Sequence, residues 1–189
     1  MNRRDALSRV ALILGGTVIG ANVFLDGCKP ADKKATDAAF TADDITFLDE
    51  VAETIIPETD TPGAKAAAVG SFMTVMVNDC YTPADQQTFK QGMNLLKEAS
   101  DKKFSKSFMD ISAEQKTELL NEIDKEAKDY MANKKEEDPA HYFRMMKELT
   151  LLGYFTSEPG ATKALNYVLV PGKYEGCISY NKGDRAWAL

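Results

Sequence analysis

The sequence predicts an all-α protein: a small, irregular helical bundle with a loop-rich C-terminal extension, preceded by a cleavable signal peptide. Apolar residues recur at intervals of three and four through most of the chain, which is the period of a helix with one buried face. Capping residues or prolines stand before several of these stretches. No convincing run alternates polar and apolar residues as a half-buried strand would. These observations predict helices packed around one core.

Residues 1–27 have the composition of a signal peptide. A basic start with Arg3 and Arg4 is followed by 15 uncharged residues, 10–24, whereas a span across a bilayer needs about 20. The arginine pair predicts export through the twin-arginine pathway, which carries cargo that folds or loads a cofactor before it crosses the membrane. A general secretory signal is the alternative.

The signal peptide ends in a lipobox, Leu25-Asp-Gly-Cys28, in which a small residue precedes the cysteine. We expect Cys28 to be the site of lipid attachment and the mature N-terminus, which would hold the protein on the periplasmic face of a bacterial membrane without a spanning helix. An ordinary exported protein that is cleaved nearby is the alternative. Residues 28–39 are rich in Lys, Asp and Ala and are expected to form a flexible tether.

The chain from Cys28 onward has the size of one domain, which we expect at residues 40–189. This part of the chain holds 20 basic and 27 acidic side chains. Because nucleic acid is itself an anion, the excess of negative charge argues against a nucleic-acid partner.

Cys80 and Cys177 are the two cysteines besides Cys28. In an oxidising compartment they could form a disulfide, which would tie the C-terminal tail to the middle of the domain. Two free, partly buried thiols, or one thiol bridged to a partner, are the alternatives. The sequence leaves these possibilities open.

The first two helices of the domain flank a loop rich in proline. Thr41 and Asp44 form a capping pair for a helix that Pro57 ends, and a second helix is expected from about Lys65. Residues 57–64 contain two prolines and a glycine, which predict a turn-dense loop. The apolar positions are Ile45, Leu48, Val51, Ala52, Ile55 and Ile56 in the first helix, and Val69, Phe72, Met73, Met76, Val77 and Cys80 in the second.

The next two helices carry clear start signals. Thr82-Pro83 supplies an N-cap and a first helical residue for a third helix, which is expected to end near Ser100. A capping box of Ser112 and Gln115 begins the fourth. The apolar positions are Phe89, Met93 and Leu96 in the third helix, and Leu119, Leu120, Ile123, Ala127 and Tyr130 in the fourth.

Pro139 is expected to open a fifth helix, the most apolar stretch of the mature chain. A helix that is apolar on most sides must be central to a bundle or covered by another protein. A short helix with Leu165 and Val168 should follow, and then an irregular tail from Pro171. The apolar positions of the fifth helix include Tyr142, Phe143, Met145, Met146, Leu149, Leu152, Tyr154 and Phe155.

The residues show no catalytic, cofactor or metal site. The single histidine, His141, stands near the start of the fifth helix, where a capping or surface role is expected rather than metal binding. The chain has no Cys-x-x-Cys pair, and no glycine fingerprint follows a strand. Acidic clusters lack the spacing of a calcium loop. We therefore expect a protein that is not an enzyme by itself.

Three segments carry a family resemblance. They are Pro57-Glu-Thr-Asp-Thr-Pro-Gly-Ala64, the stretch Phe143–Gly160 with its Leu-x-x-x-Gly-Tyr-Phe-Thr-Ser-Glu core, and Pro171-Gly-Lys-Tyr-Glu-Gly-Cys177. On these residues the chain resembles the gluconate 2-dehydrogenase subunit 3 family, from about Phe40 to the C-terminus. The resemblance implies a non-catalytic small subunit of a membrane-associated, FAD-dependent sugar or sugar-acid dehydrogenase.

The resemblance also implies a set of partners. In that family the large partner is a flavoprotein of the glucose-methanol-choline class, which holds the FAD, and electrons commonly leave through a cytochrome c. A small subunit with the twin-arginine leader would stabilise the flavoprotein. It would also carry that leaderless partner through the twin-arginine translocase after FAD is loaded.

Aromatic residues near the end of the fifth helix and in the tail are candidate contacts with the partner. Tyr154, Phe155 and Trp187 fit this role because large aromatic side chains dominate protein interfaces. Core packing is the alternative, and it is considered even for Tyr154 and Phe155.

The loop after the first helix is a further candidate contact. Thr61, Pro62 and Gly63 could touch the partner or merely cap two helices, and the second alternative is slightly favoured. The other function considered is an exported helical lipoprotein that acts as a structural or binding module without a redox partner.

Overall fold

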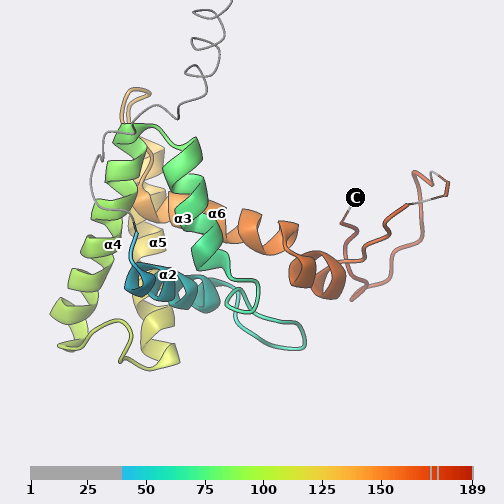
Figure 1. The fold of residues 1–189 in the computed structure, drawn as a ribbon, viewed down its shortest axis with the longest axis horizontal. Coiled ribbons are helices and arrows are strands. Elements are labelled where there is room, and N and C mark those ends of the chain that lie inside the picture. The colour runs from blue at the N-terminus through green and yellow to red at the C-terminus, as the bar shows by residue number, and fades with distance from the viewer. Residues whose placement is uncertain (1–39, 171, 174, 189) are drawn as a thin grey trace, which may run out of the picture. The chain divides into compact units, whose positions relative to one another are not determined.

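The computed structural model describes residues 40–170, 172–173 and 175–188, and Figure 1 shows how their helices are arranged. The elements are α2 (Ala42–Ile55), α3 (Val69–Cys80), α4 (Pro83–Phe104), α5 (Ala113–Asn133), α6 (Tyr142–Thr156) and the π-helical turn η1 (Gly160–Ala164). Within these residues the β pairing consists of one isolated bridge, between Asn166 and Trp187. The prediction of an all-α fold is confirmed. The expected signal peptide and tether, with Arg3, Arg4 and Cys28, lie outside the described residues.

The N-terminus of α2 is fixed by the capping box that the sequence predicts. The Thr41 hydroxyl accepts from the Asp44 N–H at 3.2 Å, and the Asp44 carboxylate accepts from the Thr41 N–H at 3.1 Å. The same carboxylate pairs with Lys97 of α4 at 3.2 Å. Burial by itself would raise the pKa of Asp44, but the bonds from Thr41 and Lys97 outweigh it and lower the pKa.

Helix α3 begins later than predicted, at Val69 instead of about Lys65. The preceding residues form turns that end at Ala68, whose φ of 51° lies in the left-handed region and stops a helix from running through it. Acidic side chains of α2 hold this path, because Glu53 accepts from the Lys65 N–H at 2.8 Å and Asp49 accepts from the Gly70 N–H at 2.7 Å.

Helix α4 runs past the predicted end at Ser100 and continues to Phe104. Ser105 ends it with a φ of 54° and donates its N–H to the Asp101 carbonyl at 2.9 Å. Lys102 and Lys103 therefore lie in the last turn, where positive charge is favourable next to the exposed carbonyls. The N-cap of α4 at Thr82 and the capping box of α5 are both confirmed.

The last two helical elements start or end differently from the prediction. Helix α6 begins at Tyr142 and not at Pro139, because the His141 Nδ1 accepts from the Phe143 N–H at 3.2 Å and caps the helix there. The capping role expected for His141 is confirmed. The short helix ends at Ala164, before Leu165, which is extended and leads into the bridge.

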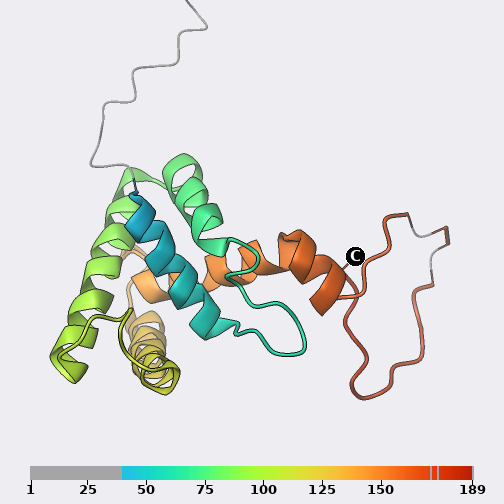
Figure 2. The same cartoon turned by 60° about the horizontal axis from the view of Figure 1, so that its bottom comes forward.

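The apolar helix α6 lies at the centre of the bundle, where it packs against α2, α3, α4 and α5 (Figure 1 and Figure 2). Its backbone comes close to α3 at Gly153, where an added Cβ would lie 2.6 Å from the Phe72 ring. Of the two alternatives considered from the sequence for this helix, the structure shows the central position. The α6 side chains in the core are Phe143, Met145, Met146, Leu149 and Tyr154, which meet Leu48, Met73, Phe89, Leu96 and Leu120 of the other helices.

The cap at His141 predicts a pH dependence of stability. Burial lowers the pKa of His141 below its usual 6.5, against the opposing charge of Glu126. The unfolded chain then takes up its proton at a higher pH than the folded chain does. This contribution to the free energy of unfolding is complete above pH 6.5 and is lost as the pH falls through the folded pKa.

We expect His141→Asn, which can still cap a helix but does not titrate, to lose stability less steeply than the wild type over roughly pH 8 to 5. Urea unfolding of both proteins at each pH measures the free energy of unfolding. The difference between the two profiles removes the pH dependence of the carboxylates, which both proteins contain. Parallel profiles would show that His141 does not titrate differently in the two states.

Candidate partner interface

The exposed side of α6 changes from charged to apolar along the helix. Near its start Arg144 and Glu148 form an ion pair on the surface, and near its end Leu151, Leu152 and Phe155 are 41–46% exposed. Spacings of three and four residues place these side chains on one face. The helix α6 packs against η1, which leads into the C-terminal extension. An exposed apolar surface on one face of a helix is a feature of protein interfaces.

Tyr154 lies in the core, although it is next to Phe155. Its side chain is 1% exposed, and its hydroxyl donates to the Pro62 carbonyl at 2.6 Å. The candidate assignment of Tyr154 to the partner interface is therefore corrected to its alternative, core packing. Successive helical residues point about 100° apart, since one turn takes 3.6 residues, so Phe155 can be 41% exposed beside a buried neighbour.

The loop between α2 and α3 is organised by Glu53. Its carboxylate accepts from the N–H groups of Glu58 and Lys65, both at 2.8 Å. Gly63 is buried against this carboxylate, and a Cβ at that position would overlap it. With the Pro62 carbonyl bonded to Tyr154, the loop caps and joins two helices, which is the alternative considered from the sequence. Thr61 stays partly exposed.

Asn166 closes the C-terminal extension into a loop. Its N–H donates to the Ala186 carbonyl at 2.8 Å, its carbonyl accepts from the Ala188 N–H at 2.9 Å, and its side-chain amide donates to the Arg185 carbonyl at 3.0 Å. The extension leaves the helices beyond η1, on the side away from α4 (Figure 1 and Figure 2). Its apolar residues are exposed, and Trp187, a predicted contact, is 56% exposed.

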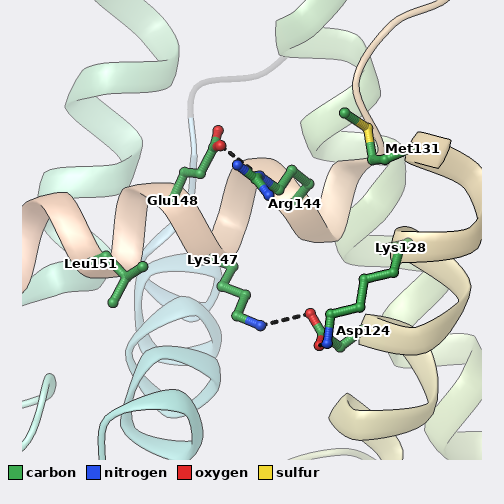
Figure 3. A pocket seen from close by; sticks show the side chains of 8 residues that line it. Asp124, Lys128, Met131, Arg144, Lys147, Glu148 and Leu151 are labelled. Carbon is green, nitrogen blue, oxygen red and sulfur yellow. Dashed lines mark hydrogen bonds and ion pairs between the residues drawn. The ribbon is translucent and has the colours of Figure 1, made fainter.

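A cleft of about 290 Å³ lies between α5 and α6 (Figure 3). Asp124 of α5 points into it and pairs with Lys128 at 2.6 Å and with Lys147 of α6 at 2.7 Å. Hydrogen bonds from these two lysines hold the pKa of Asp124 below its usual value. Because each charged side chain that lines the cleft is held in an ion pair within it, we assign the cleft to joining α5 and α6.

The two thiols of the domain are free in the structure. Cys80 ends α3, Cys177 lies in the C-terminal extension, and both are exposed. No disulfide joins Cys80 to Cys177 in this structure, and both thiols are exposed rather than partly buried.

The described residues contain no arrangement that would hold a metal ion, in that no three of their His, Cys, Asp or Glu side chains come together. Every buried side-chain nitrogen or oxygen in this part of the chain has a hydrogen-bond partner. None of the described helices combines the length and the apolar character needed to cross a membrane. The exposed apolar side chains near the end of α6 and in the extension form the candidate partner interface.

The sequence patterns did not indicate the roles of Glu53 and Asn166. Glu53 fixes the loop between α2 and α3, and Asn166 closes the C-terminal extension. Glu53 falls among the polar positions of an amphipathic helix, where a solvated side chain is the normal expectation. Asn166 bonds to residues about twenty positions later, and no local pattern marks such a contact.

A model of the gluconate 2-dehydrogenase subunit 3 family matches residues 42–172. The chain belongs to this family. The match includes all helices from α2 to α6, η1, the Glu53 loop and the first part of the extension. Members of this family are non-catalytic, accessory subunits of a dehydrogenase complex. No curated protein and no solved structure gave a significant match to the chain.

The role of Glu53 predicts a loss of stability on substitution. We expect Glu53→Gln to lower the free energy of unfolding by about 2 kcal/mol, because an amide can accept with one oxygen only and sets an NH2 group against a backbone N–H. Urea unfolding measures the change. Glu58→Gln, at an exposed side chain in the same loop, is the matched control and should change stability by less than about 0.5 kcal/mol. Equal effects of the two substitutions would contradict the role of Glu53.

Proposed function

We propose that this protein is the small, non-catalytic subunit of an exported, FAD-dependent dehydrogenase that oxidises a sugar or a sugar acid. In this proposal it stabilises a flavoprotein of the glucose-methanol-choline class, which holds the FAD and carries out the catalysis. The observation that carries the proposal is the family match, which covers residues 42–172.

The surface of the subunit supports a role as a binding partner. Most of the large apolar side chains that the described residues expose lie on the last turns of α6 or in the extension. Phe155 and Trp187 are the aromatic members of this surface that the sequence singled out. An apolar surface of this kind is unfavourable in water and favourable in a complex, so we assign it to the flavoprotein.

The leader supports a role in export. A flavin is inserted in the cytoplasm, and a loaded flavoprotein then needs a route for folded cargo. A subunit that carries Arg3 and Arg4 could supply the export signal for both chains. In the proposal, lipid at Cys28 then keeps the complex on the periplasmic face of the membrane, where a cytochrome c takes the electrons.

Co-purification tests the proposal directly. We expect a C-terminally tagged subunit, extracted from membranes of its host in mild detergent, to bring with it a second chain that has flavin absorption bands. The preparation should reduce a dye with a sugar or sugar acid as the electron donor. A colourless, inactive and monodisperse preparation would contradict the proposal and favour a helical lipoprotein without a redox partner.

Substitution of the arginine pair tests the export role. We expect Arg3→Lys with Arg4→Lys to leave both this subunit and the flavoprotein in the cytoplasm, because lysine keeps the charge but not the pair that the twin-arginine pathway reads. Immunoblots of cytoplasmic and periplasmic fractions measure the distribution. Arg9→Lys, outside the pair, is the matched control and should export normally. Normal export of the flavoprotein with the double variant would refute the carrier role.

A further inference from the structure

The C-terminal extension forms an arm, which we define as residues 166–170, 172–173 and 175–188. Asn166, the first residue of the arm, forms three hydrogen bonds of 2.8–3.0 Å with the other end of the arm. Its partners there are Arg185, Ala186 and Ala188. Closing both ends on one residue limits the conformations that the segment between them can take. The arm is therefore a pre-shaped loop joined to the bundle next to the exposed end of α6.

The arm exposes more apolar surface than an isolated loop in water should. Leu169 and Val170 are 80% and 76% exposed, and Tyr180 is 74% exposed. Ile178 and Trp187 are more than half exposed as well. Loops at a protein surface are normally polar, so this composition indicates that another surface covers the arm.

The charge of the arm is opposite to that of the helical bundle. Residues 40–159 hold 13 basic and 23 acidic side chains, whereas residues 166–188 hold three basic and two acidic ones. Lys182 and Arg185 form no ion pair within the described residues, while the neighbouring Asp184 is bonded to the Asn181 N–H at 2.8 Å. Two cations thus remain available beside the exposed aromatic residues.

We propose that the arm enters an apolar groove with an acidic rim on the flavoprotein subunit. Leu169, Val170 and Tyr180 fill the groove, and Lys182 and Arg185 pair with the rim. This inference rests on the proposed function, and it adds the chemistry of the partner surface. The groove continues the contact that begins at Phe155 on α6. Because the bundle is strongly acidic, it would repel an acidic partner surface, and the basic arm is the part that can approach one.

Asn166 acts in this contact as a positioning residue. An open arm would lose its conformational freedom when it binds, and this loss would weaken the complex. The three bonds of Asn166 fix the loop before binding and so remove part of that cost. The side-chain bond to the Arg185 carbonyl is the one that a substitution can remove without changing the backbone.

The test uses the complete complex, co-expressed and purified through a tag on the flavoprotein, with gel filtration and dissociation rates measured at several salt concentrations. We expect Leu169→Ser with Val170→Ser to speed dissociation on the order of tenfold or more, since a few buried anchors carry most of an interface. Leu95→Ser, at an exposed apolar side chain of α4, is the control and should leave the rate unchanged.

Charge variants test the acidic rim. We expect Lys182→Glu with Arg185→Glu to slow association and to reduce its dependence on salt, because opposite charges steer the encounter. Lys106→Glu with Lys125→Glu reverses the same number of exposed charges on the helical bundle and is the matched control. Asn166→Ala should weaken the complex with no change in the urea unfolding of the isolated subunit, because it loosens the arm only.

The outcomes distinguish failure of the proposed function from failure of the arm contact. If the wild-type subunit does not purify with a flavoprotein, both the proposed function and the arm contact fail. If the wild-type complex forms and the arm variants dissociate as slowly as it does, the arm contact fails while the proposed function stands. If the arm variants keep the complex but lose binding to vesicles of anionic phospholipid, the arm binds membrane and the inference is overturned.

Discussion

The rest of the structure depends on the need to cover α6, a helix that is apolar on most of its surface. Four other helices pack around it, and their shared core closes over Phe143, Met146 and Leu149. On the last turn Tyr154 stays in this core and is bonded to the Pro62 carbonyl, whereas Phe155 is left exposed. The same apolar helix thus builds the core and exposes apolar side chains near its C-terminal end.

Acidic residues of α2 place the elements around the end of α6. Asp49 fixes the start of α3 through the Gly70 N–H, and Glu53 closes the loop that contains the acceptor of Tyr154. Glu50 pairs with Lys116 of α5 at 2.7 Å, and hydrogen bonds from Lys116 and Lys65 lower the pKa of this carboxyl. One polar edge of a single helix therefore positions α3, α5 and the loop, and a rigid scaffold of this kind suits a subunit that presents a surface to a partner.

Local signals in the sequence predicted much of the fold, and long-range contacts account for what they missed. The capping boxes at Thr41 and Ser112 act between residues three positions apart, so the sequence reveals them directly. The start of α3 depends on a left-handed Ala68 that α2 holds from outside the segment. Periodicity marked Tyr154 and Phe155 alike as apolar, and only the position of the loop decides which of them is buried. The hydrogen bonds of Asn166 join residues about twenty positions apart, and no local sequence pattern indicates such a contact.

The most direct test of the proposed interface compares side-chain oxidation by hydroxyl radicals in the isolated subunit and in the purified dehydrogenase complex. We predict that Leu152, Phe155 and Trp187, which are 41–56% exposed in the subunit, lose reactivity in the complex. Leu95 on α4 and Met109 before α5 should keep theirs, since they lie outside the proposed surface. Unchanged oxidation of Leu152, Phe155 and Trp187, or protection confined to Leu95 and Met109, would contradict the claim that the end of α6 and the extension bind the partner.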